Sequence, residues 1–396
     1  QSPCVRCPGR HVRCYALGIG VLLASFGRAE TEYLGPSSVV LSRDAETLFV
    51  ACADSCELLW VTRSTGAVAR RVSLPAEPTE IVLSQDGTRL IVACAAPRSL
   101  IVVLDSGSGD QVAEIPVGHT ASSLALDADA NRVLVCNRFD NNLSVVDLAS
   151  HREVARIPVV REPIAVAITP DARVALVANH IPNMRADAGL TGTVAPVVTV
   201  VDTQTFQTTS IELHNGASSL RDLCVSPDGR YCLVTHVLSN FLDIPFRVET
   251  GWINVNVVSI IDIQKRKVTR TIGLDEMDLG AGNPWDVAFT PDGQTVCVTC
   301  AGTHLLAVIS TSDLLRMDAP RALSPIPGAW PEYPSLGARL CGPRHLAGKP
   351  PHALSPSRSN VLVAPSISDT LRALDSARDA HSSLYILFRQ LPCSSV

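Results

Sequence analysis

Short apolar segments alternate with polar turns along most of the chain, and one pattern returns seven times. Each copy holds a first apolar segment, a turn built on Ser or Thr with Asp and Gly or their relatives, and a second apolar segment. The copies read VVLSRDAETLFVAC (39–52), IVLSQDGTRLIVAC (81–94), LALDADANRVLVCN (124–137), VAITPDARVALVAN (166–179), LCVSPDGRYCLVTH (223–236), VAFTPDGQTVCVTC (287–300) and HALSPSRSNVLVAP (352–365). Apolar runs of strand length, separated by such turns, predict antiparallel hairpins.

A fixed offset relates the copies to one another. The anchor of each copy is an apolar residue of its first segment: Leu41, Leu83, Leu126, Ile168, Val225, Phe289 and Leu354. The residue 11 positions after the anchor ends the second segment each time: Cys52, Cys94, Asn137, Asn179, His236, Cys300 and Pro365. The first anchors are 42, 43 and 42 residues apart, whereas the later steps of 57, 64 and 65 residues indicate insertions. The chain is therefore an internal repeat in which each copy is one structural unit.

Two further apolar segments complete a unit. A third segment ends at an Asp, as in VVLD (102–105) and SVVD (144–147), and a fourth follows a polar turn, as in QVAEIPV (111–117). Four short strands per repeat of about 42 residues predict one blade of a propeller. We expect an all-β fold, a seven-bladed β-propeller of four-stranded antiparallel blades, in one domain over residues 30–396. Its blades would start near residues 39, 81, 124, 166, 223, 287 and 352, and the seventh is degenerate because Pro365 replaces the usual Asn.

The repeats resemble a known family. LVCNRFDNNLSVVD (134–147) and LVANHIP followed by VVTVVD (176–202) are similar to the YVTN-type propeller repeat, over residues 37 to about 390. NRFDN (137–141), ANHIP (178–182), THVLSNF (235–241) and GWIN (251–254) resemble a group of bacterial exported propellers. Those proteins are often fused to a cytochrome c or di-haem peroxidase-like domain, so the resemblance implies a c-type cytochrome as a partner. Haem attachment needs Cys-x-x-Cys-His, which this sequence lacks, and we therefore predict no cofactor.

The first 29 residues have the features of a secretory leader. Arg10, His11 and Arg13 precede the apolar stretch 15–26, and Gly27 and Ala29 provide small residues before a cleavage point at Glu30. This pattern predicts an exported bacterial protein, periplasmic or extracellular, and the alternative is a buried apolar strand or an unstructured leader. No other segment is apolar enough to predict a membrane span.

The insertions indicate which face of the propeller carries function. In a blade, the connections between second and third strands and those between blades lie on one face, and the insertions 180–196, 237–256, 275–285 and 318–350 are expected there. Long loops on a regular scaffold usually carry function. Polar and aromatic side chains that could bind a ligand collect in these loops or at the strand ends beside them: Asn137, Arg138, Asn179, His180, His236, Trp252, Asn254 and His304.

Metal and disulfide chemistry are weaker alternatives. His180 and His236 are the metal candidates, since imidazole is a common metal ligand, but they lack a tight ligand spacing and could equally cap strand ends. Cys224 and Cys232 flank a Pro-Asp-Gly turn and could form a cross-strand disulfide. The cysteines at the ends of the second strands are expected to be small buried hydrophobic residues.

Three functions remain open at this stage. The net charge of −5 argues against nucleic acid as a partner, and the chain has no catalytic motif that would identify an enzyme. The first hypothesis is an exported binding or scaffold module whose loop-rich face meets a protein or a small molecule. The second is the propeller component of a cytochrome-linked periplasmic redox system, and the third is a lactonase-like hydrolase.

Overall fold

The side chains of the repeat motif build the hairpins of the structure, which is a computed structural model. It describes residues 34–127, 131–184, 194–239, 254–275, 280–303 and 305–316, and the backbone of 345–346, 351–356, 360–365, 370–375 and 383–387. All of these residues belong to one compact unit, Tyr33–Pro392. Predictions that fall on other residues, including the leader, lie outside the described part of the chain.

The Ser/Thr-x-Asp motif closes the turn between the first and second strands. In the second repeat, Asp86 Oδ1 accepts the N–H of Thr88 at 3.0 Å, and Ser84 Oγ accepts the N–H of Arg89 at 2.9 Å. The same contacts recur at Asp44, Asp171, Asp228 and Asp292. The Ser84 hydroxyl also donates to Asp86 Oδ1 at 2.5 Å, and this bond, followed by those from the N–H and hydroxyl of Thr88, holds the carboxylate in its charged form and lowers the pKa of Asp86 to about 2.

The described residues form an all-β propeller with six four-stranded antiparallel sheets and one five-stranded sheet. The first sheet contains β1 (Pro36–Leu41), β2 (Thr47–Cys52), β3 (Glu57–Thr62) and β4 (Val68–Ser73). The second contains β5 (Glu77–Leu83), β6 (Arg89–Ala95), β7 (Leu100–Asp105) and β8 (Gln111–Pro116). The third contains β9 (Ala121–Asp127), β10 (Arg132–Asn137), β11 (Asn142–Asp147) and β12 (Arg152–Pro158). The fourth is β13 (Pro163–Ile168), β14 (Val174–Asn179), β17 (Val197–Asp202) and β18 (Thr208–Glu212), with a separate pair β15 (Asn183–Met184) and β16 (Val194–Ala195).

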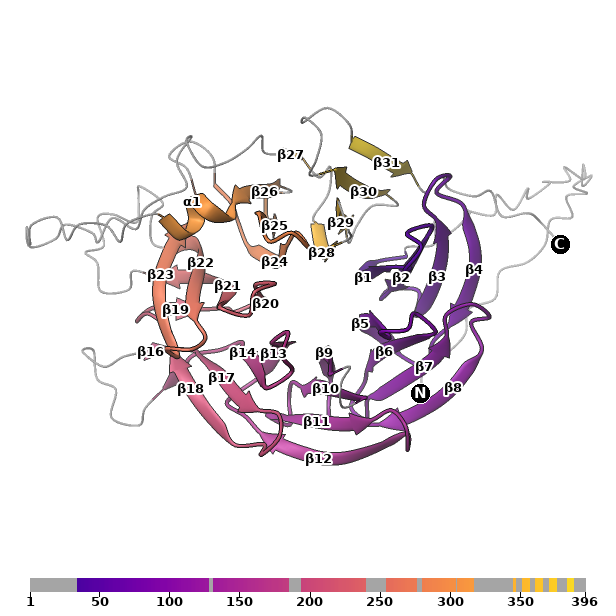
Figure 1. Cartoon of the computed structure of the whole chain (residues 1–396), viewed down its shortest axis with the longest axis horizontal. Helices are drawn as coiled ribbons and strands as arrows, with labels where there is room; N and C mark the ends of the chain where they lie inside the picture. The colour runs from indigo at the N-terminus through magenta and orange to yellow at the C-terminus, as the bar shows by residue number, and fades with distance from the viewer. Residues whose placement is uncertain are drawn as a thin grey trace, which may run out of the picture. The chain divides into compact units, whose positions relative to one another are not determined.

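The remaining sheets follow in chain order. The five-stranded sheet has β19 (Ala217–Ser218), β20 (Leu223–Val225), β21 (Tyr231–Ser239), β22 (Asn254–Asp262) and β23 (Lys267–Gly273). Next come β24 (Pro284–Phe289), β25 (Thr295–Cys300), β26 (Leu305–Ser310), the helix α1 (Thr311–Arg316) and β27 (His345–Leu346), and then β28 (Pro351–Pro356), β29 (Asn360–Pro365), β30 (Thr370–Asp375) and β31 (Ser383–Leu387). In Figure 1 the sheets follow one another around a common centre, with the first strand innermost in the four-stranded sheets and β20 innermost in the β19–β23 sheet.

The β19–β23 sheet departs from the expected four strands. Ser219 adopts a left-handed backbone conformation with φ 52°, which divides the innermost strand into β19 and β20. The β21–β22 hairpin is also extended to nine residues per strand, and β19 pairs with the extension at Val237 and Leu238. Residues 237–239 and 254–256 of the expected insertion 237–256 are therefore strand, and residues 240–253 lie outside the described part.

Two other expectations need correction. We placed 318–350 in a loop between blades, but His345 and Leu346 pair with β26 as the outermost strand of their sheet, so the segment before them joins a third strand to a fourth. Cys224 pairs with Leu233, and Cys232 pairs with Val225, which puts the two cysteines on opposite faces of the sheet, and both are free thiols. Burial raises the pKa of each of these two thiols.

The core lies between neighbouring sheets. The described residues form six clusters of buried apolar side chains, five of which join two neighbouring sheets, and Val, Leu, Ile, Ala and Cys supply nearly all of them. Cys52, Cys94 and Cys300 are fully buried within these clusters, as small hydrophobic residues. Among the described residues, no helix is both long and apolar enough to cross a membrane.

Candidate functional site

The innermost strands surround a central cavity of about 980 Å³. Residues of β1, β5, β9, β13, β20 and β24 line it, so its wall comes from consecutive sheets. The polar side chains in this wall include Ser38, Glu80, Ser123, Arg221, Asp222 and Asp286. A cavity of this size lies in the range of small-molecule binding sites.

A bulge in the innermost strands explains why polar side chains point between the sheets. Pairing skips Ser37 in β1, Thr79 in β5 and Ser122 in β9, so that none of them has a paired residue on the neighbouring strand. Their hydroxyls donate to the next sheet: Ser37 to the carbonyl of Pro78 at 2.6 Å, Thr79 to that of Ala121 at 2.8 Å and Ser122 to that of Pro163 at 3.0 Å. The hydroxyls of Ser37 and Thr79 also lie 3.3 Å from carbonyls of their own sheet, those of Ala51 and Ala93. The bulges thus redirect one hydroxyl per repeat into a contact between sheets.

In each of these inner strands, the residue after the bulge accepts a backbone hydrogen bond from the next sheet. The N–H of Ile81 donates to Ser38 Oγ at 3.3 Å, and that of Leu124 donates to Glu80 Oε2 at 2.7 Å. Ser123 Oγ accepts from Val166 at 3.2 Å, and Asp222 Oδ2 accepts from Val287 at 2.9 Å. Ala165 occupies the equivalent position in β13 and has no side-chain acceptor. Sheet junctions on either side of β13 therefore differ in their polar contacts.

Three of the side chains at the cavity wall are partly buried carboxyls, those of Glu80, Asp222 and Asp286. Burial raises the pKa of Glu80 to about 7, although hydrogen bonds from Ser123 and Leu124 oppose that rise, and the nearby Asp222 adds to it. Burial also raises the pKa of Asp222, whose carboxyl shares a hydrogen bond with that of Asp286. Two carboxyls in hydrogen-bond contact retain a proton between them more readily than either would alone.

A second group of charged and polar residues lies at strand ends next to Arg221, which lines the cavity. Glu162 Oε2 accepts from Nε and Nη2 of Arg138 at 3.1 and 2.9 Å, and the carbonyl of Glu162 accepts the N–H of His180 at 2.8 Å. His180 Nδ1 lies 2.6 Å from the carbonyl of Leu220, and the N–H of Leu220 donates to the carbonyl of His180 at 3.1 Å. A carbonyl can only accept, so Nδ1 carries the proton, while burial lowers the pKa of His180 and keeps the ring neutral.

Arg221 follows Leu220 and completes this rim. Its guanidinium carbon lies 4.2 Å from the centroid of the Trp285 ring, a cation–π contact between neighbouring sheets. Its Nε is buried without a hydrogen-bond partner among the described residues. We define the rim as Arg138, Glu162, His180, Arg221 and Trp285; the residues come from the ends or beginnings of β10, β13, β14, β20 and β24.

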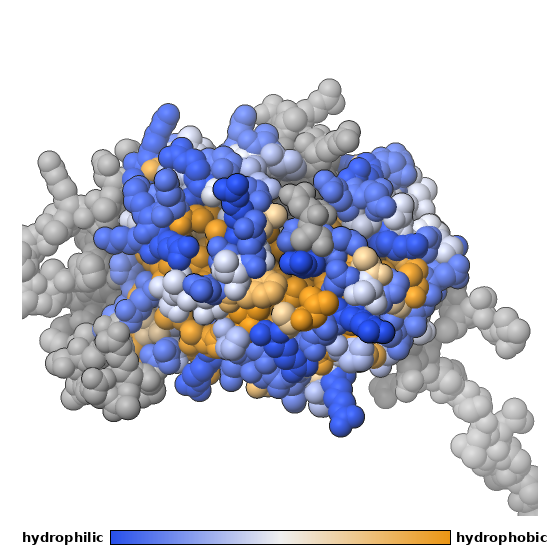
Figure 2. All heavy atoms as spheres, turned by 60° about the horizontal axis from the view of Figure 1, so that its bottom comes forward, coloured by the Kyte–Doolittle hydropathy of each residue, from blue (hydrophilic) through white to orange (hydrophobic). Residues whose placement is uncertain are grey.

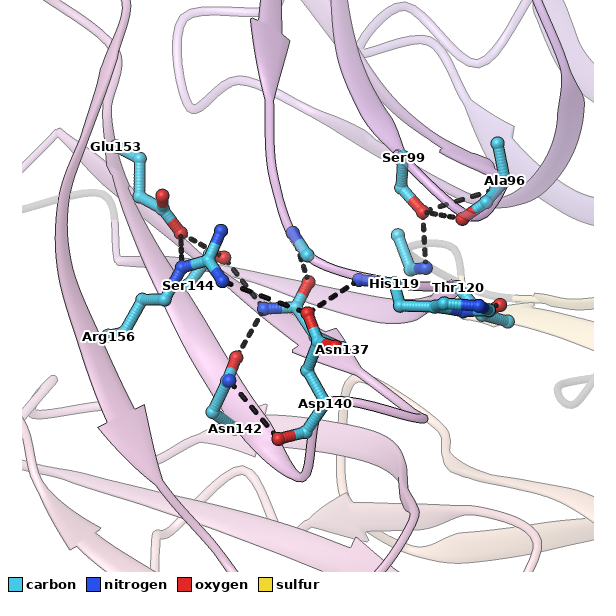
Figure 3. Close-up of polar contacts among 12 residues, drawn as sticks. Ala96, Ser99, His119, Thr120, Asn137, Asp140, Asn142, Ser144, Glu153 and Arg156 are labelled. Atoms are coloured by element: carbon cyan, nitrogen blue, oxygen red, sulfur yellow. Dashed lines mark hydrogen bonds and ion pairs between the residues drawn. The ribbon is translucent and has the colours of Figure 1, made fainter.

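The predicted residues Asn137 and Asn179 end their strands as fully buried amides. Asn137 Oδ1 accepts the N–H of Gly118 at 3.0 Å, and its Nδ2 donates to Asn142 and Ser144, as Figure 3 shows. Asn179 Nδ2 donates to the carbonyl of Val197 at 2.8 Å and to Thr199 at 2.9 Å. Both amides tie their strand ends to neighbouring segments, and a ligand role for either stays a prediction.

The predicted histidines are not alike. His236 is fully buried, with Nε2 at 2.8 Å from Ser259 Oγ and Nδ1 at 3.1 Å from the carbonyl of Val237, and burial lowers its pKa to about 4. His180 lies on the rim with Arg138. Among the residues that the structure describes, no three His, Cys, Asp or Glu side chains are placed to share a metal ion.

The other predicted residues lie at the edge of the description or beyond it. Asn254 opens β22 with an exposed side chain that accepts the hydroxyl of Ser239 at 2.6 Å. Trp252 and His304 lie outside the described residues. The prediction missed Arg221, Glu162 and the wall residues Glu80, Ser123 and Asp222. A sequence signal for the wall does exist, because a polar residue stands three places before the anchor in five repeats: Ser38, Glu80, Ser123, Asp222 and Asp286.

Beside the rim, the loop face exposes an aromatic residue. Phe139 is 52% exposed in the β10–β11 turn. The His119 ring meets it edge-on at 5.3 Å, and Arg138 lies 5.1 Å from its centroid. In Figure 3 Asp140 lies between Arg156 and His119, whose backbone N–H it accepts at 2.8 Å. Figure 2 shows apolar atoms gathered in the middle of the view, with hydrophilic residues around them.

Comparisons with known proteins support the fold. No family model matches the chain, so membership of the YVTN-type family stays a prediction. Hydrazine synthase subunit beta of Kuenenia stuttgartiensis is 26% identical over 127 residues, which are 32% of this chain and 33% of that protein. The match thus spans about a third of the length of this curated relative. The solved structure of Kuenenia stuttgartiensis hydrazine synthase is similar with a TM-score of 0.78 at 22% identity, over 90% of this chain and 99% of that chain, a likeness of fold.

Proposed function

We propose that this chain is an exported binding or scaffold module, a seven-bladed propeller whose loop-rich face docks a protein partner. In this proposal the five-stranded sheet β19–β23 is the seventh blade beside the six four-stranded ones, with a divided inner strand. The leader pattern in residues 1–29 supports a periplasmic or extracellular location. The observation that carries the proposal is the exposed and firmly held Phe139 on the insertion face.

Phe139 has the features of an interface anchor. The β10–β11 turn joins a second strand to a third, as do the β14–β17 and β21–β22 connections that contain the insertions, so all three lie on one face. Aromatic and arginine side chains dominate the binding energy of protein interfaces. Contacts with His119 and Arg138 hold the Phe139 ring before any partner arrives, which reduces the entropy lost on binding.

The fold comparison favours a partner in a multi-subunit protein. The matched relative is named as a subunit of hydrazine synthase, and the similar fold covers 90% of the present chain. A chain that forms one subunit of an assembly needs a protein-binding surface more than it needs its own catalytic site. The loop face with Phe139 would provide that surface.

Affinity purification of the tagged protein from its native host tests the proposal. We expect a stoichiometric partner that is retained by the natural protein and lost from the Phe139→Asp variant. Val154→Asp is the matched control, because Val154 is 54% exposed but lies on the outermost strand β12, away from the loop face. Natural protein without a stoichiometric partner, or a partner that Phe139→Asp still retains, would contradict the proposal.

A second candidate function is a component of a haem-linked redox system. Resemblance to propellers fused to cytochrome domains, together with the similarity to hydrazine synthase subunit beta, favours it. The partner would then be a c-type cytochrome docked on the same face. A Soret absorption band in the purified native complex, absent from the isolated chain, supports this function, and a partner complex without haem rejects it.

A further inference from the structure

Among the described residues, none pairs with the charge of Arg221. In the described residues its guanidinium has no hydrogen-bonding or ion-pairing acceptor, and its contact is the face of Trp285 at 4.2 Å. The pKa of Arg221 is lowered, first by burial and then by repulsion from Arg138, and no carboxylate offsets either effect. A half-buried cation without a partner costs free energy that a bound anion would recover.

Several other arginines of the described part differ from Arg221 in this respect. Arg71, Arg89, Arg138 and Arg156 each form an ion pair with a carboxylate at 3.0 Å or less. Arg230 also stacks on an aromatic ring, that of Tyr231 at 5.4 Å, but it is exposed to water. Arg221 combines burial, an aromatic contact and the absence of an acceptor, and it also lines the central cavity.

The surroundings of Arg221 suit a small anion. Arg138 is close enough to repel Arg221, and it pairs with Glu162 through one carboxylate oxygen, Oε2. His180, fixed on Leu220 beside Arg221, donates through Nδ1 and leaves Nε2 without a hydrogen bond among the described residues. Because the His180 imidazole is neutral, it does not compete with an anion for Arg221.

From this arrangement we propose that the cavity beside Arg221 and Trp285 binds a small organic carboxylate. The planar guanidinium offers two parallel N–H donors, which match the two oxygens of a carboxylate. The cavity of about 980 Å³ has room for the rest of such a molecule. This site is separate from the docking surface at Phe139, and either can exist without the other.

Calorimetric titration with acetate, at pH 7.5 and constant low ionic strength, tests the proposal on the isolated chain. We expect saturable binding of acetate and none of acetamide, which has the same shape without the charge. Arg221→Gln should weaken acetate binding at least about tenfold, because a hydrogen bond to a charged group is lost. Arg230→Gln is the matched control and should bind acetate as the natural protein does.

Several outcomes would overturn the proposal. They are acetate binding that Arg221→Gln leaves unchanged, equal binding of acetamide, and no saturable acetate binding by the natural protein. If Arg221→Gln folds poorly, the comparison of acetate with acetamide on the natural protein still decides the matter. A negative result here leaves the protein-docking function untouched, since no partner takes part in the titration.

Discussion

The carboxylate of Glu80 accepts the backbone N–H of Leu124 at 2.7 Å, across the junction between the β5–β8 and β9–β12 sheets. A glutamate therefore does at this junction what a serine does at the neighbouring ones, where Ser38 and Ser123 accept the equivalent N–H groups. The difference is that Glu80 can ionise. Its position in the cavity wall makes one sheet junction sensitive to pH.

Replacing Glu80 with Gln should remove a pH dependence of folding. The folded-state pKa of about 7 is above the ordinary value of 4.5, so the folded protein holds this proton more tightly than the unfolded chain. The resulting stabilisation is complete below pH 4.5 and is lost as the pH rises through 7; it amounts to about 3 kcal/mol at most. Urea unfolding at pH 5 and pH 8 measures it. Glu77→Gln, an exposed change on the same strand, should keep the natural pH profile, and an unaltered profile in Glu80→Gln would contradict the expectation.

Replacing His236 with Asn should reduce the loss of folding stability at acidic pH. The folded-state pKa of about 4 is below the ordinary value of 6.5, so protonation favours the unfolded chain. Stability from His236 is present above pH 6.5 and is lost as the pH falls through 4, again by about 3 kcal/mol. Asn occupies the equivalent position in two other repeats, at Asn137 and Asn179, and should fit. Unfolding midpoints at pH 4.5 and 7 should differ less in the variant; His151→Asn, in an exposed turn, serves as the control, and equal losses in all three proteins would refute the role of His236.

Gly118→Ala should loosen the end of β10. A Cβ at Gly118 would lie 2.5 Å from Asn137 Cγ and 2.6 Å from Asp140 Oδ2, so the buried amide that accepts the Gly118 N–H must move. We expect a loss of about 1–3 kcal/mol in unfolding free energy. Gly107→Ala meets its nearest atom at 3.5 Å and should change stability by less than about 0.5 kcal/mol. Similar stabilities for the two variants would show that the Asn137 contact contributes little.

Ala172→Gly should stabilise the protein. Ala172 has a φ of 55° in the turn before β14, a conformation that costs a residue with a Cβ, and Gly87, Gly229 and Gly293 hold the equivalent place in other repeats. Relief of that strain should exceed the entropy cost of Gly and add about 0.5–1 kcal/mol, measured by thermal unfolding. Ala175→Gly, in the buried strand β14, should destabilise instead. A loss of stability in Ala172→Gly would mean that the turn is not strained.

The repeat predicted the strands because their determinants are local. The 11-residue offset places the ends of β2, β10, β14 and β25 at Cys52, Asn137, Asn179 and Cys300, where the structure has them. Third strands were expected to end at an Asp, and β7, β11 and β17 do. Each of these features is set by side chains within a few residues, in the turn or on the alternating strand.

The rim and the fourth strand of the β24–β27 sheet depend on residues far apart. The cation–π contact of Arg221 is with Trp285, which is distant in sequence, and no local sequence pattern links the two residues. β27 is two residues long, well removed from β26, and carries no hairpin signal. The division of β19 from β20 at Ser219 likewise follows from the extended β21–β22 hairpin that pairs with it. Interactions of this kind are properties of the assembled sheets.

Ala165 lies at a sheet junction whose stability should depend on temperature differently from that of its neighbours. The β13–β20 junction has no side-chain acceptor at that position and is filled by a cluster of apolar side chains that includes Ala165, Leu176, Leu220 and Leu223. Apolar association weakens on cooling, whereas the hydrogen bonds at Ser38, Glu80 and Ser123 do not depend on that driving force. On cooling, this junction is therefore expected to lose the contribution of its apolar cluster and to depend on the two hydrogen bonds between His180 and Leu220 that also cross it.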